Sequence, residues 1–149
     1  MTSVSVAMRA TSSPPARQGP LQIVKDDPDL PTFERVCSDC HDAQRIIGAR
    51  RTQVEWEDII NKMIDKGATG SETDFEHIFK FVLRNFGRVA INRAPGQEIA
   101  LVLSLEAKDA DAIVAYRKVH GDFVNLDALI QVPGIDTKTI TAHKDALVF

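Results

Sequence analysis

The segment with the clearest chemical potential in this chain is Cys37-Ser38-Asp39-Cys40-His41. A C-x-x-C-H string is the attachment signal for a c-type haem. Two thiols one helical turn apart can form thioethers with the two vinyl groups of a haem, and the adjacent imidazole then turns toward the iron. The chain contains two cysteines, and both lie in this string. A disulfide or a redox dithiol is the alternative, but His41 favours haem c, with His41 as the proximal iron ligand.

A haem iron held by one histidine needs a thioether or an imidazole as its distal ligand. Of the three methionines, Met1 and Met8 lie in a polar N-terminal stretch, whereas Met63 lies on an apolar helical stripe seven residues after Trp56. A methionine on such a stripe can equally be core filler. His77 is the rival imidazole, but it lies off the apolar stripe of its own segment and is predicted to be a solvated surface histidine.

The composition is that of a soluble globular protein, with 44% hydrophobic and 26% charged residues in 149. The formal net charge is −3, and the sequence pI is near 5.8. The chain therefore lacks the strong basic field that tight nucleic-acid binding by bulk electrostatics needs. No run approaches the roughly 18 apolar residues of a membrane span.

The N-terminal stretch, residues 1–27, is predicted to be a flexible arm. Residues 1–20 are rich in Ser, Thr, Pro and Ala and contain no apolar core of a signal peptide. Haem c is attached on the outer side of the bacterial inner membrane. We therefore expect a periplasmic or other extracytoplasmic location, with an export signal that lies upstream of this start or is missing from this sequence.

Residues 28–87 are predicted to form one helical unit. A first helix begins near Thr32 and leads into the cysteine motif. An amphipathic helix covers about residues 53–66 and ends at Gly67, because glycine commonly terminates helices. A third helix begins at a capping-box pattern, Thr73 to Glu76, and ends at Gly87. A domain of this size has a marginal core, which a haem would enlarge.

This unit resembles small bacterial class I-type cytochrome c domains over about residues 31–86. The matching features are the cysteine motif, Arg51-Thr52 leading to Trp56, Met63 with Gly67 four residues later, and a final aromatic helix with Phe81-Val82-Leu83. The resemblance implies that Met63 is the distal iron ligand and that Phe33 lies where the first and last helices cross. Met/His ligation raises the reduction potential. Unlike many such domains, this chain has no proline soon after His41, so the second partner of its imidazole is not predicted.

Several side chains are candidates for contacts with the haem propionates. Arg45, Arg50 and Arg51 follow the cysteine motif closely, and a guanidinium fork suits a carboxylate. The alternative is a solvated basic loop. Trp56 could donate its indole N–H to a propionate while its ring packs on the haem, or it could simply fill the core.

Residues 88–149 are predicted to form a second helical unit, so the whole chain is expected to be all-α. We expect a helix through Ile99 and Val102, a long helix over about 108–120, a short one around 126–130, and a last helix that carries Ile140 and Leu147.

This second unit resembles the tandem helix-hairpin-helix domains of bacterial competence DNA receptors (ComEA-like). The matching landmarks are Ile91-Asn92-x-Ala94, Ala110-x-Ala112-Ile113-Val114-x-Tyr116-Arg117, Gly121-x-Phe123-x-x-Leu126-x-x-Leu129 and Val132-Pro133-Gly134-Ile135. In that family, Gly-hydrophobic-Gly turns hold DNA phosphates through backbone N–H groups. Here those turns align with residues 104–106 and 134–136, where Glu106 and Asp136 replace glycines. Asp136 is predicted to be the N-cap of the last helix.

The charge balance of this unit disfavours DNA binding. From residue 87 onward there are seven Lys and Arg against eight Asp and Glu, whereas DNA affinity depends mainly on cation–phosphate contacts. Gly134, Ile135 and Lys138 are the remaining candidate nucleic-acid contacts. We expect the unit to dock a protein partner; a true DNA-binding role is the alternative.

The chain as a whole is therefore predicted to be a bacterial electron-transfer protein with one covalent haem c and a redox partner protein. No paired carboxylates, nucleophile with a base, or phosphate loop indicate an enzyme. A subunit of a dehydrogenase complex and a haem-based sensor remain alternatives.

Overall fold

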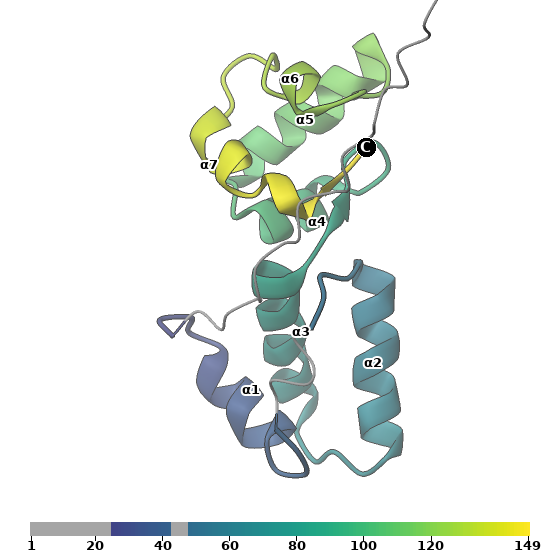
Figure 1. The fold of residues 1–149 in the computed structure, drawn as a ribbon, viewed down its shortest axis with the longest axis vertical. Coiled ribbons are helices and arrows are strands. Elements are labelled where there is room, and N and C mark those ends of the chain that lie inside the picture. Colours follow the sequence, from purple (N-terminus) through teal and green to yellow (C-terminus); the bar gives the residue numbers. More distant parts are fainter. Residues whose placement is uncertain (1–24, 43–47) are drawn as a thin grey trace, which may run out of the picture.

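The computed structural model describes residues 25–42 and 48–149 of the chain, and this part is mostly helical, as predicted (Figure 1). Its elements in chain order are α1 (Leu30–Cys37), α2 (Gln53–Asp65), α3 (Glu72–Phe86), β1 (Val89–Ala90), α4 (Gly96–Leu103), α5 (Ala107–His120), α6 (Leu126–Leu129), α7 (Thr137–Ala142), a 3₁₀ turn (Lys144–Ala146) and β2 (Leu147–Val148). Within these described ranges, no helix has the length and apolar character needed to cross a membrane.

The N-terminal unit is built around α3, which packs against α1 on one side and α2 on the other (Figure 1). Helix α1 begins at Leu30, two residues earlier than predicted, and holds Pro31 in its first turn. Proline is tolerated there because the first N–H groups of a helix have no partner within it. The Phe33 ring lies 4.5 Å from that of Phe81, measured between centroids. The predicted crossing of the first and last helices is thus confirmed.

Two capping boxes set where α2 and α3 begin. The side chain of Thr52 accepts a hydrogen bond from the N–H of Glu55, whose carboxylate accepts one from the N–H of Thr52. The capping box predicted for residues 73–76 was wrong in register. Ser71 and Asp74 make the reciprocal bonds instead, at 3.1 and 2.9 Å. The N-cap of α3 therefore lies two residues earlier than the predicted capping box placed it.

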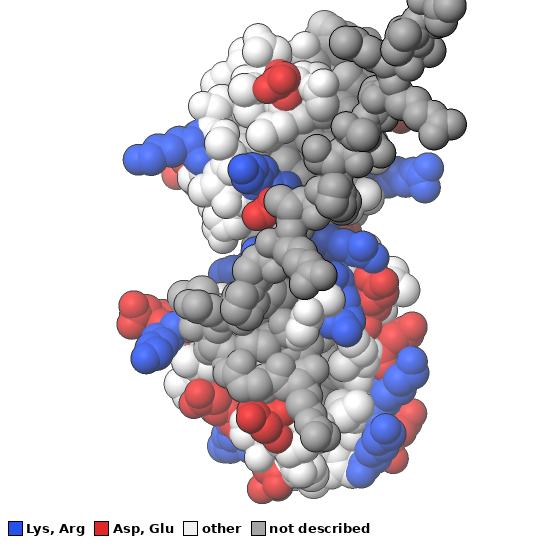
Figure 2. Space-filling model, in the orientation of Figure 1, with Lys and Arg blue, Asp and Glu red and all other residues white. Residues whose placement is uncertain are grey.

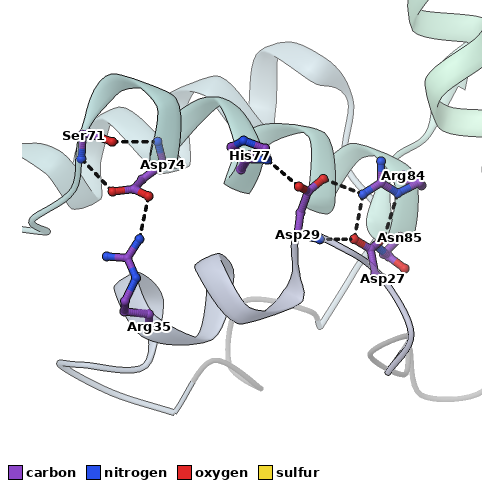
Figure 3. Close-up of polar contacts among 8 residues, drawn as sticks. All are labelled: Asp27, Asp29, Arg35, Ser71, Asp74, His77, Arg84 and Asn85. Atoms are coloured by element: carbon purple, nitrogen blue, oxygen red, sulfur yellow. Dashed lines mark hydrogen bonds and ion pairs between the residues drawn. The ribbon is translucent and has the colours of Figure 1, made fainter.

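A polar cluster ties the start of the described chain to α3 (Figure 3). Arg84 donates to both carboxylate oxygens of Asp27 and to Asp29, each at 2.7 Å, and Asn85 donates to Asp27 at 2.8 Å. His77 lies 2.5 Å from the other oxygen of Asp29. Asp27 is only 8% exposed, so the ordered unit includes this residue, which the predicted boundary left in the arm.

The C-terminal unit consists of two helical hairpins, α4–α5 and α6–α7, and is closed by a small parallel sheet. Val89 pairs with Leu147, and Ala90 pairs with Val148. The prediction that Leu147 belongs to the last helix was therefore wrong: α7 ends at Ala142, and the chain then extends to pair with β1. This pairing depends on a segment nearly sixty residues away in sequence, which helical periodicity could not reveal.

Helix α3 also packs against α4, so the two units meet directly. At their junction Gly87 is buried, and a Cβ atom at this position would lie 2.1 Å from the carbonyl oxygen of Leu83 and 3.0 Å from Val102. A side chain does not fit between the end of α3 and α4. Glycine is required here for close approach, in addition to ending α3 as predicted.

Candidate functional site

A cavity of about 760 Å³, including its open mouth, lies among the three helices of the N-terminal unit. Helix α1 and the residues after it contribute one wall, α2 a second and α3 a third. The described residues that line it are Phe33, Val36, Cys37, Cys40, His41, Trp56, Ile59, Ile60, Met63, Lys66, Ala68, Phe75, Ile78 and Val82. The structure thus brings both cysteines, the adjacent histidine and Met63 to one largely apolar cavity.

Both cysteines are free thiols, with Cys37 half-buried and Cys40 exposed. Burial raises the pKa of the Cys37 thiol to about 11. Because the thiolate is the reactive form in disulfide exchange, a redox dithiol needs a lowered rather than a raised pKa. The thiol environment therefore disfavours the redox-dithiol alternative.

His41 lies in the segment after α1 and is half-buried. Its Nδ1 lies 3.3 Å from the carbonyl oxygen of Asp42. In the tautomer with a proton on Nδ1, this atom donates to the carbonyl and Nε2 is left as a lone-pair donor. A backbone carbonyl is a common partner for the second nitrogen of a metal-binding imidazole. The carbonyl of Asp42 is thus a partner for the second imidazole nitrogen of His41, which the sequence did not predict.

Met63 is half-buried and reaches the same cavity from α2. His77 is not among the described residues that line this cavity, and its ring contacts Asp29 instead (Figure 3). The expectation that His77 is solvated was incomplete: its side chain is 44% exposed, but one ring nitrogen is paired with a carboxylate. This pairing argues against His77 as a distal ligand.

Trp56 is fully buried and forms part of the cavity wall. Its indole N–H donates to the carbonyl oxygen of Phe86 at 3.1 Å. This bond holds α2 against the end of α3 and favours the alternative that Trp56 packs in the core over a propionate contact. The ring remains available for packing in the cavity.

The arginines after the cysteine motif also face elsewhere. Arg50 donates to the carbonyl oxygens of Asn85 and Gly87 at 3.3 and 3.2 Å, so its Nη1 serves the end of α3 rather than a propionate. Arg51 donates to the carbonyl of Ala49 at 3.0 Å, and its guanidinium lies 5.2 Å from the Trp56 ring centroid. Neither arginine is among the residues that line the cavity. Arg45 lies outside the described residues.

Lys66 is a cation at the cavity that sequence reasoning missed. It is exposed and lies just after α2, one residue before Gly67. Nothing in the sequence pattern distinguishes Lys66 from other solvated lysines. Its position at the cavity depends on how the end of α2 and the cysteine motif are arranged in the folded chain.

The turns of the two helical hairpins differ from Gly-hydrophobic-Gly turns, in which free backbone N–H groups bind a phosphate. Ser104 adopts a left-handed conformation (φ 53°) at the first turn, and Glu106 pairs with Lys108 at 2.6 Å. At the second turn, Gly134 has φ 79°, and Asp136 accepts hydrogen bonds from the N–H groups of Lys138 and Thr139 at 3.0 and 3.1 Å.

The predicted N-cap role of Asp136 is thus confirmed. Its carboxylate occupies backbone donors of the kind that hold phosphates in a DNA-binding hairpin.

The two hairpins are also joined through buried Asp109, which accepts a hydrogen bond from the N–H of Asp136 at 3.2 Å.

Two polar residues of the helix-hairpin-helix pattern, Asn92 and Arg117, also make hydrogen bonds that hold the unit together. Asn92 exchanges two hydrogen bonds with the backbone of Phe123, at 2.8 and 2.9 Å. Arg117 donates to the carbonyl oxygens of residues 91 and 94. These polar side chains are engaged within the fold.

Charged side chains are scattered over the C-terminal unit. Figure 2 shows separate basic and acidic groups on its visible face, with no continuous basic stripe. Lys138 is exposed beside the second turn. The visible described surface therefore offers isolated cations rather than the basic footprint typical of a DNA-binding face.

Comparisons with known proteins identify the C-terminal unit. Residues 84–148 match the family of the helix-hairpin-helix motif. A protein of Haemophilus influenzae, described only as an uncharacterized protein, is 40% identical over 63 residues, which are 42% of this chain and 56% of the relative. The chain thus matches little more than half the length of that relative. No solved structure matches the chain.

Proposed function

We propose that residues 28–87 form a monohaem cytochrome c domain that transfers single electrons. In this proposal Cys37 and Cys40 hold the haem through thioethers, and His41 and Met63 are the iron ligands. The observation that carries it is the convergence of these four side chains on one cavity, from α1 and the segment after it and from α2. The C-x-x-C-H string supports attachment, and the shared cavity supports Met63 as the second ligand.

The residues of the cavity fit a haem in chemistry. Ile59, Ile78 and Val82 make its walls apolar, as the flat faces of a porphyrin require. The thiols are free, and the one cation among the described lining residues, Lys66, is exposed and suits a carboxylate. The fit supports one covalent haem c.

The haem would supply an iron that cycles between the ferric and ferrous states. The protein residues would hold its surroundings constant: His41 lies in the segment that follows α1, Met63 lies on α2, and both helices pack on α3. Buried Trp56 and Ile78 exclude water from the inner end of the cavity. An apolar site with histidine and methionine ligands raises the reduction potential and leaves no open iron position. These features support an electron carrier rather than an enzyme.

Optical spectra of the matured full-length protein test this proposal. We expect covalent haem and a low-spin, six-coordinate spectrum in both oxidation states. The sulfur-to-iron band should disappear in Met63→Ala and persist in His77→Gln, which removes the rival imidazole. A five-coordinate or carbon-monoxide-binding wild-type protein would remove Met63 as a ligand and favour a haem-based sensor. Absence of covalent haem would refute the proposal.

For the C-terminal unit we propose protein docking, which positions the haem domain against its redox partner. The occupied turn at Asp136 and the scattered cations support docking over DNA binding. The helix-hairpin-helix motif itself is compatible with DNA binding, so DNA is the second candidate, with Gly134, Ile135 and Lys138 as its contacts.

Retention of the full chain on immobilised duplex DNA separates the two roles. We expect no retention even at low salt. Salt-sensitive retention that Lys138→Ala reduces and Lys118→Ala does not would establish the DNA-binding role instead.

Attachment of haem c also supports a periplasmic or other extracytoplasmic location. Cell fractionation of the native protein tests this: haem-bearing protein found only in the cytoplasmic fraction would contradict it.

A further inference from the structure

A second hollow lies outside the haem cavity, as an open groove between α2 and α3. Its volume is about 750 Å³ including the open mouth. The floor is formed by four apolar side chains, of which Ile64 is 39% exposed. The complete set of described lining residues is Glu57, Ile60, Asn61, Ile64, Glu72, Phe75, Glu76 and Phe79. The groove thus combines an apolar floor with three carboxylates.

The three carboxylates of this acidic groove lack positive partners within the described structure. No ion pair joins Glu57, Glu72 or Glu76 to a described residue, and no lysine or arginine is among the described residues that line the groove. Glu57 accepts one neutral hydrogen bond, from Gln53 at 2.9 Å. Burial and the charge of Glu57 together raise the pKa of nearby Glu98. The three glutamates of the groove therefore make no ion pair with a described residue.

The acidic groove and the proposed haem cavity share two wall residues. Ile60 and Phe75 line both hollows. A molecule seated in the groove would therefore contact side chains that also face the cavity. Such closeness is what direct electron transfer between two proteins requires.

We propose that the acidic groove between α2 and α3 is the docking site for a redox partner that presents a basic amphipathic helix. This inference rests on the proposed haem function. Lysine or arginine side chains of the partner would pair with the glutamates, and its apolar face would cover Ile64 and Phe79. Helix α2 has 13 residues and is roughly 20 Å long, enough to match several turns of a partner helix.

Electron exchange at this site is chemically simple. The partner is a one-electron carrier protein, and one electron passes between its redox centre and the haem iron. What one centre gains the other loses, and no covalent bond forms or breaks. Complementary charge mainly accelerates the encounter and selects the partner, because exposed charges steer association over distances of about a Debye length.

The test uses the full matured chain and a fluorescein-labelled synthetic peptide, an amphipathic helix with lysines on one face and leucines on the other. Binding is followed by fluorescence anisotropy at low salt. The first variant replaces all three groove glutamates (Glu57→Gln, Glu72→Gln, Glu76→Gln). The matched control makes the same change in net charge at exposed positions outside the groove (Glu34→Gln, Asp122→Asn, Asp127→Asn).

We expect the groove variant to raise the Kd of the peptide about tenfold and the control variant to raise it less than twofold. Ile64→Ala should also weaken binding, because it removes part of the apolar floor. Equal binding by wild type and groove variant, or an equal loss in both triple variants, would overturn the proposal. Circular dichroism verifies that each variant is folded.

The same experiment separates failure of the docking site from failure of the haem function. Anisotropy measures docking, whereas the optical spectrum of the same sample reports the haem. If both hold, the bound label should be quenched by the haem, because groove and cavity share a wall. Specific binding without quenching in haem-loaded protein would contradict the proposed closeness.

Discussion

Replacing Arg84 by methionine should strongly destabilise the N-terminal unit at neutral pH. The guanidinium of Arg84 makes three hydrogen bonds of 2.7 Å to Asp27 and Asp29, whose side chains are 4% and 10% exposed (Figure 3). Methionine preserves most of the side-chain volume but removes the charge. Two nearly buried carboxylates would then lack their main partner.

The expected loss follows from the burial of this cluster. Removing one partner of a buried ion pair costs about 3–5 kcal/mol, because the remaining charge is left uncompensated. Arg84 is itself 27% exposed, and His77 and Asn85 still contact the carboxylates. We therefore expect the low end, about 3 kcal/mol. For a chain of this size, that corresponds to a fall in Tm of roughly 6–12 °C.

The pH dependence gives this prediction a second observable. Burial of the Asp27 carboxyl raises its pKa, but hydrogen bonds from Arg84 and Asn85 outweigh this effect and hold the pKa below its usual value. The pKa of Asp29 is lowered in the same way by Arg84 and His77, against its burial. A lowered native pKa stabilises the fold above the unfolded value of about 3.9, and this stabilisation is lost as the pH falls through the native pKa.

In Arg84→Met the buried carboxyls can protonate, so the difference from wild type should shrink on acidification. The assay is urea unfolding followed by circular dichroism at several pH values between 7 and 3. Arg93→Met, at an exposed position, is the matched control and should change the free energy of unfolding by less than about 0.5 kcal/mol. A difference below about 1 kcal/mol at pH 7, or one that is constant with pH, would refute the reasoning.

Three further predictions concern single hydrogen-bonding side chains. Trp56→Phe removes one of the two donors to the Phe86 carbonyl, which still accepts from the N–H of Arg51, and should cost about 0.5–1.5 kcal/mol in thermal unfolding; a loss confined to haem spectra would contradict this structural role. Asn92→Ala frees both backbone groups of Phe123 and should cost about 1–3 kcal/mol, whereas an unchanged Tm would show that water replaces the side chain. Asp136→Ala should lower the Tm and speed amide exchange in α7, because it removes the N-cap; Asp136→Asn, which can still cap, is its control.

Most of the helices could be predicted from the sequence because their signals are local. The stripe from Trp56 to Ile64 repeats at helical spacing, and glycines at positions 67 and 87 follow the ends of α2 and α3. Errors arose where a competing local signal existed. Ser71 displaced Thr73 as the N-cap of α3, and Leu147 left the predicted last helix for a strand whose partner is distant in sequence.

In the candidate site, too, only the features encoded by neighbouring residues could be predicted from the sequence. The spacing of Cys37, Cys40 and His41 predicts haem attachment on its own, because thioether formation depends on neighbouring residues. The propionate contacts assigned to Trp56 and Arg50 could not be checked from sequence. The N–H donors of both side chains bind main-chain carbonyls at the end of α3, and only the folded structure brings these carbonyls within reach.

The sequence by itself thus determined the helical class, the C-x-x-C-H string, the helix-hairpin-helix pattern and the capping role of Asp136. Each depends on residues within a few positions of one another. Only the tertiary structure decided that Met63 and His41 face one cavity, that His77 is turned away toward Asp29, and that an unpaired acidic groove adjoins the cavity. These arrangements depend on how α1 and α2 pack against α3, and such packing is set by contacts between residues far apart in the chain.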